Sequence, residues 1–159
     1  MRYDGIIKTY PQLIKFIEKK FSIIAVCPEV ETGLSTPRPA VQLHGSLQDI
    51  KILGRDNPAV DITRSMQAFC EQRPPQLNSI QGYIFKSRSP SCGIKDIPLF
   101  NTAGKTIGKT QGVFVSAMLQ HYPNLPITDE SGLETPEQCE QFFRKVKQYQ
   151  KNNYAKSRL

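Results

Sequence analysis

Long apolar runs, secretion signals and closely paired cysteines are all missing from this 159-residue sequence. No stretch approaches the roughly 20 apolar residues that a membrane helix needs, and the first residues carry no apolar region or cleavage site of a signal peptide. A cytoplasmic location and no membrane partner are therefore expected. None of the four cysteines forms a Cys-x-x-Cys pair, which excludes zinc-ribbon and thioredoxin motifs on pattern. The segment Gly104–Thr110 falls one residue short of a P-loop, which argues against nucleotide binding there.

Acidic residues are scarce at the C-terminal end. The net charge is +7, and much of the excess of basic over acidic residues lies in residues 144–159. In the rest of the chain the numbers of basic and acidic residues are nearly equal. Such a run is typical of a solvated helix face and a basic tail, so nucleic acid is expected to make no more than non-specific contact. The predicted division is a single domain at 1–147 and a basic C-terminal tail at 148–159. The sequence does not specify an oligomeric state.

Helical and strand patterns alternate along the chain, which predicts an α/β class. The apolar run at 22–26 has the character of a strand buried on both faces of a parallel sheet, and 82–85 is a second strand. We expect one Rossmann-like domain with a mainly parallel sheet and helices on both faces. The remaining helices are expected from Pro11, Thr63 (as N-cap, ending at Pro74-Pro75), Val113 and Thr135 (with a capping box to Gln138). The other expected elements are a small hairpin or excursion within 41–53, a hairpin arm at 97–105 and a short edge strand at 125–127.

The cysteines fall into two kinds. Cys70 and Cys139 stand at helical spacing among apolar residues, and both are interpreted as small core side chains. Cys27 and Cys92 follow the two predicted strands and are flanked by loop residues. Ligands of open parallel sheets bind beyond the carboxyl ends of the strands. If the strands are neighbours, the thiols of Cys27 and Cys92 converge there.

Three chemistries fit two converging thiols. They can ligate a metal or an iron–sulfur cluster, with Gly93 leaving room near the backbone. They can form a redox disulfide. One of them can act alone as a nucleophile, its thiolate favoured by Lys86 and Arg88.

Glu29 is a candidate general acid or base, or else a surface carboxylate. Further polar residues lie in the second loop, either to bind a ligand or to reach solvent and hold the turn: Lys86, Arg88, Ser89 and Ser91.

Several motifs in order resemble the thiouracil desulfidase (TudS) family, which in some proteins is fused to a YbgA-like domain. The similarity covers the chain to about Val146. It is carried by Arg2–Gly5, Cys27–Val30, Gly33-Leu34, Pro37–Pro39, Asp61–Thr63, Lys86–Gly93 and Gly108-Lys109.

The resemblance implies a [4Fe-4S] cluster held by three cysteines, with the fourth iron open to the sulfur of a small thiolated substrate such as 2-thiouracil. Water then replaces the sulfur without redox change. Cys27 and Cys92 are implied as metal ligands, and Glu29 as the proton-transfer residue. The candidates for orienting the ring are Lys86, Ser89 and Ser91.

The chain departs from the family pattern at its start. The first ligand of the family lies in a Cys-Leu-Leu-Gly motif just before the counterpart of Arg2–Gly5, at the end of a first strand that this sequence lacks. Either the natural protein extends upstream, or the chain has lost the cluster. A sheet without a strand that is often central should be less stable, which favours the first explanation. The alternative to a desulfidase is a cluster-free member of the fold that binds a small ligand or a protein. A third reading is an RNA-associated module.

Overall fold

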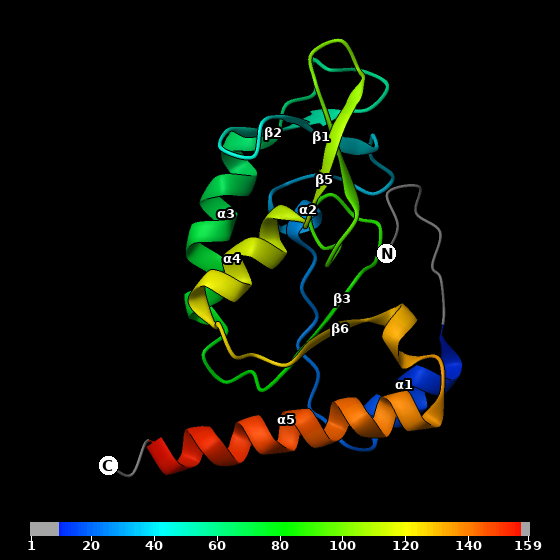
Figure 1. Ribbon diagram of the computed structural model, residues 1–159, viewed down its shortest axis with the longest axis vertical. Helices are drawn as coiled ribbons and strands as arrows, with labels where there is room; N and C mark the ends of the chain where they lie inside the picture. The colour runs from blue at the N-terminus through cyan, green and yellow to red at the C-terminus, as the bar shows by residue number, and fades with distance from the viewer. Residues whose placement is uncertain (1–9, 157–159) are drawn as a thin grey trace.

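The computed structural model describes residues 10–156 (Figure 1). The motif Arg2–Gly5 and the end of the basic tail lie outside this range. The elements, in chain order, are α1 (Pro11–Glu18), α2 (Pro28–Glu31), β1 (Val41–Gly45), β2 (Ile50–Gly54), α3 (Thr63–Gln76), β3 (Tyr83–Phe85), β4 (Ile97–Phe100), β5 (Thr106–Thr110), α4 (Val113–His121), β6 (Ile127–Asp129), the 3₁₀ helix η1 (Glu130–Leu133) and α5 (Pro136–Lys156).

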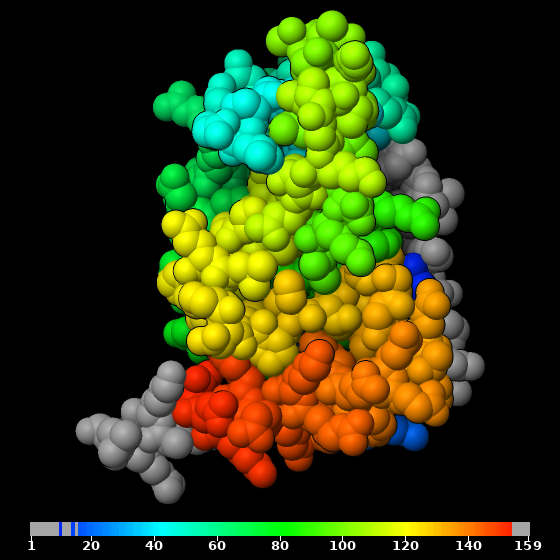
Figure 2. Space-filling model, in the orientation of Figure 1, coloured from blue at the N-terminus to red at the C-terminus, as the bar shows by residue number. Residues whose placement is uncertain are grey.

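The larger sheet has four strands in the order β2-β1-β4-β5. Both predicted hairpins are confirmed, since β1 pairs with β2 and β4 with β5 in antiparallel fashion. The hairpins join through a parallel contact between β1 and β4. Alternate residues of these strands face α3, so that Leu43, Ile52, Met66 and Leu99 form one core. In the space-filling view, the β4–β5 arm stands at the top, above α4 (Figure 2).

The second sheet consists of β3 and β6, which pair in parallel with Tyr83 opposite Ile127. Phe114 of α4 is fully buried against this pair, with its ring in contact with those of Tyr83 and Phe85. The expected strand at 82–85 is confirmed. The expected edge strand at 125–127 lies slightly later, at β6. The α/β class is thus confirmed, with the strand pairings shared between two sheets.

The expectation of a buried strand at 22–26 is wrong. Residues 21–27 run as an extended segment without ladder pairing to any described strand, and the side chains of Ile23 and Ile24 are 59% and 52% exposed. A strand forms only where a neighbour satisfies its backbone N–H and C=O groups. The expected strand is therefore not formed, because the described residues supply no strand beside this apolar run.

Helix boundaries follow local hydrogen bonding. The capping box is confirmed: the amide of Gln138 donates to Oγ1 of Thr135 at 3.3 Å, and the amide of Thr135 to Oε1 of Gln138 at 3.1 Å. Thr63 is not the N-cap of α3, because Ile62 takes that place and Oγ1 of Thr63 accepts from the Ile52 amide instead. Pro74 and Pro75 lie inside the last turn of α3, not beyond it.

Helix α5 runs along the base of the molecule, packed on η1 and α1 (Figure 1). The predicted boundary between a domain and a tail at residue 147 falls inside this helix.

Cys139, predicted to be a core side chain, is 5% exposed and packs with Phe142 and Val146. Cys70 is partly buried against both larger cores, as predicted. No helix among residues 10–156 combines the length and apolar character needed to cross a membrane.

Candidate functional site

Glu29 joins the two loops that carry Cys27 and Cys92. It lies in the single-turn helix α2, which begins at Pro28 directly after Cys27. One carboxylate oxygen, Oε1, accepts from Oγ of Ser91 at 3.2 Å and from Oγ of Ser89 at 3.5 Å. The predicted convergence of the two loops is therefore confirmed, although the segments that lead into them are not paired with each other.

The other oxygen of Glu29 binds Arg38. Both Nε and Nη2 of the guanidinium lie 2.8 Å from Oε2, with side-chain exposures of 3% for Arg38 and 13% for Glu29. The same guanidinium donates from Nη1 to Oγ1 of Thr36 and lies with Nη2 at 4.0 Å from Sγ of Cys27. A buried cation is thus held between the carboxylate and a cysteine sulfur, with most of its donors satisfied.

The loop of Cys92 is held in place by its own hydrogen bonds. Oγ of Ser89 accepts from the amides of Ser91 and Cys92, at 3.2 and 3.1 Å. The carbonyl of Ser91 accepts from the Phe114 amide, which ties the loop to the first turn of α4. Ser91 is fully buried. Ser89 therefore holds the turn and both serines contact Glu29. Ligand binding by these serines stays a prediction.

Glycines permit this close packing. A Cβ atom on Gly112 would lie 2.4 Å from the carbonyl oxygen of Ser91. On Gly93 it would meet Cδ1 of Ile97 at 2.2 Å and the carbonyl oxygen of Ser89 at 2.9 Å. The space at Gly93 is therefore filled by protein atoms, and the expectation that this glycine leaves room for a cluster is wrong.

Cys92 is a buried thiol. Burial, followed by the nearby charges of Glu29 and Cys27, raises its pKa from 9.0 to about 12. The effect of Cys27 on this pKa agrees with the convergence of the two loops. Cys27 is only half-buried, and its amide donates to Oε1 of Glu31 at 3.1 Å. All four cysteines are free thiols in this structure. At neutral pH Cys92 is protonated, so metal binding there would have to displace a proton.

Lys86 binds a carboxylate other than Glu29. Its Nζ forms an ion pair with Glu130 of η1, and the amide and hydroxyl of Ser87 also bind that carboxylate, at 2.9 and 2.6 Å. Arg88 is exposed, with a positive φ of 59°. Of the predicted site residues, the structure therefore joins Cys27, Glu29, Ser89, Ser91 and Cys92 into one group, and it places Lys86 in a separate ion pair.

Two residues of this region were missed from the sequence. Arg38 belongs to the Pro37–Pro39 motif, but no pattern reveals that a single arginine between prolines is buried. Tyr83 of β3 has its pKa raised by burial, with smaller contributions from Cys92 and Glu31 nearby. The strand that contains Tyr83 was predicted, but nothing in its apolar pattern indicates that this ring lies near Cys92 as well as Phe85 and Phe114.

The described cysteines match the chemistry of an iron–sulfur cluster only in part. Such clusters are held by cysteine thiolates, and Cys27 and Cys92 are of the right chemical type. However, no group of three or more His, Cys, Asp or Glu side chains suited to a metal ion occurs within residues 10–156. The residues described here therefore do not make a complete cluster site by themselves.

The fold defines the class of this protein. It is similar to the solved structure of the [4Fe-4S]-dependent thiouracil desulfidase TudS, with a TM-score of 0.55 and 24% identity over 82% of this chain and 83% of that chain. This likeness concerns the α/β fold. A family model described as 2-thiouracil desulfurase matches residues 1–130. The chain belongs to the 2-thiouracil desulfurase family. No curated protein matches it significantly.

Proposed function

We propose that this chain removes sulfur hydrolytically from a small thiolated substrate, a nucleobase such as 2-thiouracil. The observation that supports the proposal most directly is the position of Glu29. Its carboxylate lies between the Cys27 and Cys92 loops, fixed on one oxygen by Arg38 and on the other by Ser89 and Ser91. Family membership supplies the substrate class, and this network supplies a carboxylate and two hydroxyls in one partly buried place.

Glu29 is proposed as the proton-transfer residue. Replacing C=S by C=O with one water releases hydrogen sulfide, so both protons of the water must leave its oxygen and end on the departing sulfur. A carboxylate at the reacting centre can take each of these protons in turn and pass it on. Arg38 is proposed as a positioning residue, because its hydrogen bond from Nε and the close ion-pair contact of Nη2 fix the direction of the carboxylate. Ser91 and Ser89 hold the second oxygen. The half-buried Ser89 hydroxyl can turn toward a polar ring atom of the substrate, whereas the fully buried Ser91 could orient the ring only through Glu29.

Cys27 and Cys92 are proposed as two of the cysteine ligands of a [4Fe-4S] cluster, which would supply a Lewis-acidic iron for the sulfur. The remaining ligand is not found among the described residues. Lys86 remains a candidate for orienting the ring only if it leaves Glu130, to which it is bound here.

The direct test is the content of iron and acid-labile sulfide per chain after anaerobic reconstitution, together with release of sulfide from 2-thiouracil. About four irons per chain would support the proposal. Cys27→Ala and Cys92→Ala should each abolish cluster retention, whereas Cys70→Ala should retain it because Cys70 packs in the core. Glu29→Gln should keep the iron but lower the rate roughly 10²- to 10⁴-fold. Equal iron loss in Cys70→Ala and Cys92→Ala would show that this division of the cysteines is wrong.

The second candidate function is a cluster-free member of the family that binds a small ligand or a protein. The buried, protonated thiol of Cys92 favours it, since a thiol of that kind is a poor ligand until it loses its proton. A folded protein that takes up essentially no iron would support this candidate and contradict the first.

A further inference from the structure

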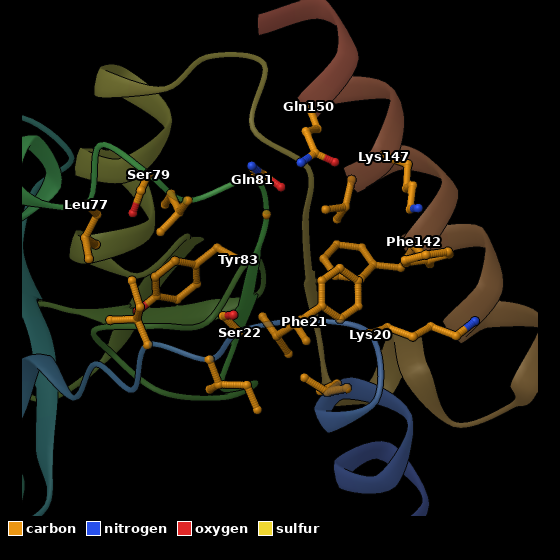
Figure 3. Close-up of a pocket in the computed structure, with 18 of the residues that line it drawn as sticks. Lys20, Phe21, Ser22, Leu77, Ser79, Gln81, Tyr83, Phe142, Lys147 and Gln150 are labelled. Carbon is orange, nitrogen blue, oxygen red and sulfur yellow. The ribbon is translucent and has the colours of Figure 1, made fainter. Parts of the chain in front are cut away.

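The segment that leads into Cys27 is not held by strand pairing. Residues 22–26 form no backbone–backbone hydrogen bond with any described residue. A cavity of about 780 Å³ lies between this segment and β3, and the side chains of Phe21 and Tyr83 are among those around it (Figure 3). The hydrogen bonds that hold the backbone of Cys27 come from residues after it in the chain.

Glu31 closes the turn at Cys27 from both sides. Its amide donates to the carbonyl of Cys27 at 2.9 Å, and Oε1 of its carboxylate accepts from the Cys27 amide at 3.1 Å. We call these two hydrogen bonds the clamp. The amide of Val30 adds a second donor to the same carbonyl, at 3.1 Å. With the backbone fixed on both sides of its Cα atom, Cys27 keeps only the torsion about its Cα–Cβ bond to place the sulfur.

Arg73 anchors the clamp to α3. Its Nε lies 3.0 Å from Oε2 of Glu31, and its Nη1 donates to Oε1 of Gln76 at 3.1 Å. The last turn of α3, which carries this arginine, is itself fixed, because Oη of Tyr122 donates to the carbonyl of the fully buried Pro74 at 2.8 Å. A chain of contacts therefore runs from the packed end of α3 to the clamp.

The two acidic residues of α2 have different surroundings. Glu29 meets the two serines of the Cys92 loop, whereas no hydrogen bond or ion pair joins Glu31 to that loop among residues 10–156. We propose that Glu31 is a positioning residue, which sets the direction of the Cys27 thiol and is itself held by Arg73. The inference rests on the proposed function, in which Cys27 is a cluster ligand.

The clamp contributes to geometry more than to stability. The ion pair of Arg73 and Glu31 has side-chain exposures of 23% and 33%, and pairs that solvent reaches add little free energy by themselves. A hydrogen bond from an amide to a charged carboxylate is stronger than one to a neutral acceptor. Loss of the carboxylate should therefore release the turn at Cys27 locally and leave the rest of the fold unchanged.

The test uses the metal-free chain, so that its result does not depend on iron uptake. Alkylation of Cys27 by iodoacetamide is followed by mass spectrometry at one fixed pH, with Cys70 as the internal reference, and hydrogen exchange of the Cys27 amide is measured by NMR. Glu31→Ala should raise both rates at Cys27 about tenfold, the scale of one hydrogen bond to a charged group, and should leave Cys70 unchanged. Arg73→Met, which keeps the clamp but removes its anchor, should give a smaller rise.

Two further variants separate position from charge. Glu31→Gln removes the negative charge but keeps an acceptor oxygen for the Cys27 amide, so both rates should stay close to those of the parent chain. Glu71→Ala removes an exposed carboxylate on α3, near Arg73 in sequence, and should change neither rate at Cys27. Circular dichroism checks the folding of each variant, and Arg73→Met carries the test if Glu31→Ala does not fold.

Three results would overturn the proposal: rates in Glu31→Gln equal to those in Glu31→Ala, a parallel rise at Cys70, or parent rates in both Glu31→Ala and Arg73→Met. The first would show that the charge of Glu31 acts without the clamp, and the second that the whole fold has loosened. The expected rates in a chain that takes up no iron would support the clamp and contradict the proposed function, so the two failures are distinguishable.

Discussion

Arg38 and Glu29 form a two-point ion pair at the point where the loops of Cys27 and Cys92 meet. Nε and Nη2 of Arg38 both lie 2.8 Å from Oε2 of Glu29, and the arginine side chain is only 3% exposed. A buried ion pair costs desolvation on both sides, so its value lies in fixing geometry more than in net stability. Removing one partner, however, leaves an uncompensated buried charge.

Arg38→Met should therefore lower the free energy of unfolding by about 3–5 kcal/mol, since Glu29 loses its counter-charge. The double variant Arg38→Met with Glu29→Gln should recover part of that loss. Lys109→Met serves as the control, because its pair with Asp96 is exposed on both sides, at 65% and 63%, and such pairs contribute about 0–1 kcal/mol. Urea unfolding measures all three. Equal losses in Arg38→Met and Lys109→Met would contradict the role given to Arg38.

The glycine at the start of α4 offers a second test of how the Cys92 loop is held. Gly112→Ala places a Cβ atom 2.4 Å from the carbonyl oxygen of Ser91, whereas at Gly108 no atom lies within 4 Å of the added Cβ. We expect Gly112→Ala to cost about 1–3 kcal/mol through backbone displacement, and Gly108→Ala to cost less than about 0.5 kcal/mol.

The same pair of glycine variants has a chemical readout. If Gly112→Ala displaces the loop, Cys92 should become more exposed and react faster with a thiol-alkylating reagent than in the parent chain. The Gly108→Ala variant should react at the parent rate. Unchanged reactivity and stability in Gly112→Ala would show that the loop absorbs a methyl group without moving.

Alkaline pH should destabilise the fold through its buried thiols. Burial is the main cause that raises the pKa of both Cys70 and Cys92 from 9.0 to about 12. The folded state therefore holds these protons more tightly than the unfolded state. Their contribution to stability is fully present below about pH 9 and is lost as pH rises toward 12. Urea midpoints should fall between about pH 9 and pH 10, and less steeply when Cys70 and Cys92 are both alanine. Equal slopes in the two proteins would contradict the assignment.

The fold was largely predictable wherever local patterns decide structure. The capping box at Thr135 and Gln138, the two hairpins and the strand at Tyr83–Phe85 depend on residues close together in sequence, and all were expected. The segment 22–26 shows the limit, because its apolar run fits a buried strand but ladder pairing depends on a neighbour that the sequence cannot place. At the site, convergence of Cys27 and Cys92 was expected if their two strands were neighbours; the two loops do meet, although segment 22–26 pairs with no described strand.

Long-range ion pairs were the part of the site that the sequence could not provide. Lys86 was expected near the reacting group, yet Glu130, which binds it, lies in η1 beside β6 and far along the chain. The role of Arg38 could not be predicted from the sequence, because its ion pair with Glu29 forms only through tertiary packing. The charges of Lys86 and Arg38 give no local signal of which carboxylate each will meet, since that choice follows from how the sheets and loops pack.

The Lys86–Glu130 pair leads to the last prediction, on acid stability. Burial alone would raise the pKa of the Glu130 carboxyl group. Hydrogen bonds from Lys86 and Ser87 have the larger combined effect and lower this pKa from 4.5 to about 2. The folded state thus binds this proton more weakly than the unfolded state. The resulting stability is present above about pH 4.5 and is lost as pH falls toward 2. Glu130→Gln should flatten the dependence of the urea midpoint on pH in this window. Ser87→Ala, which keeps the backbone bond, should give an intermediate slope. A Glu130→Gln profile parallel to that of the parent chain would show that the carboxylate titrates alike in both states and that Lys86 is free to serve elsewhere.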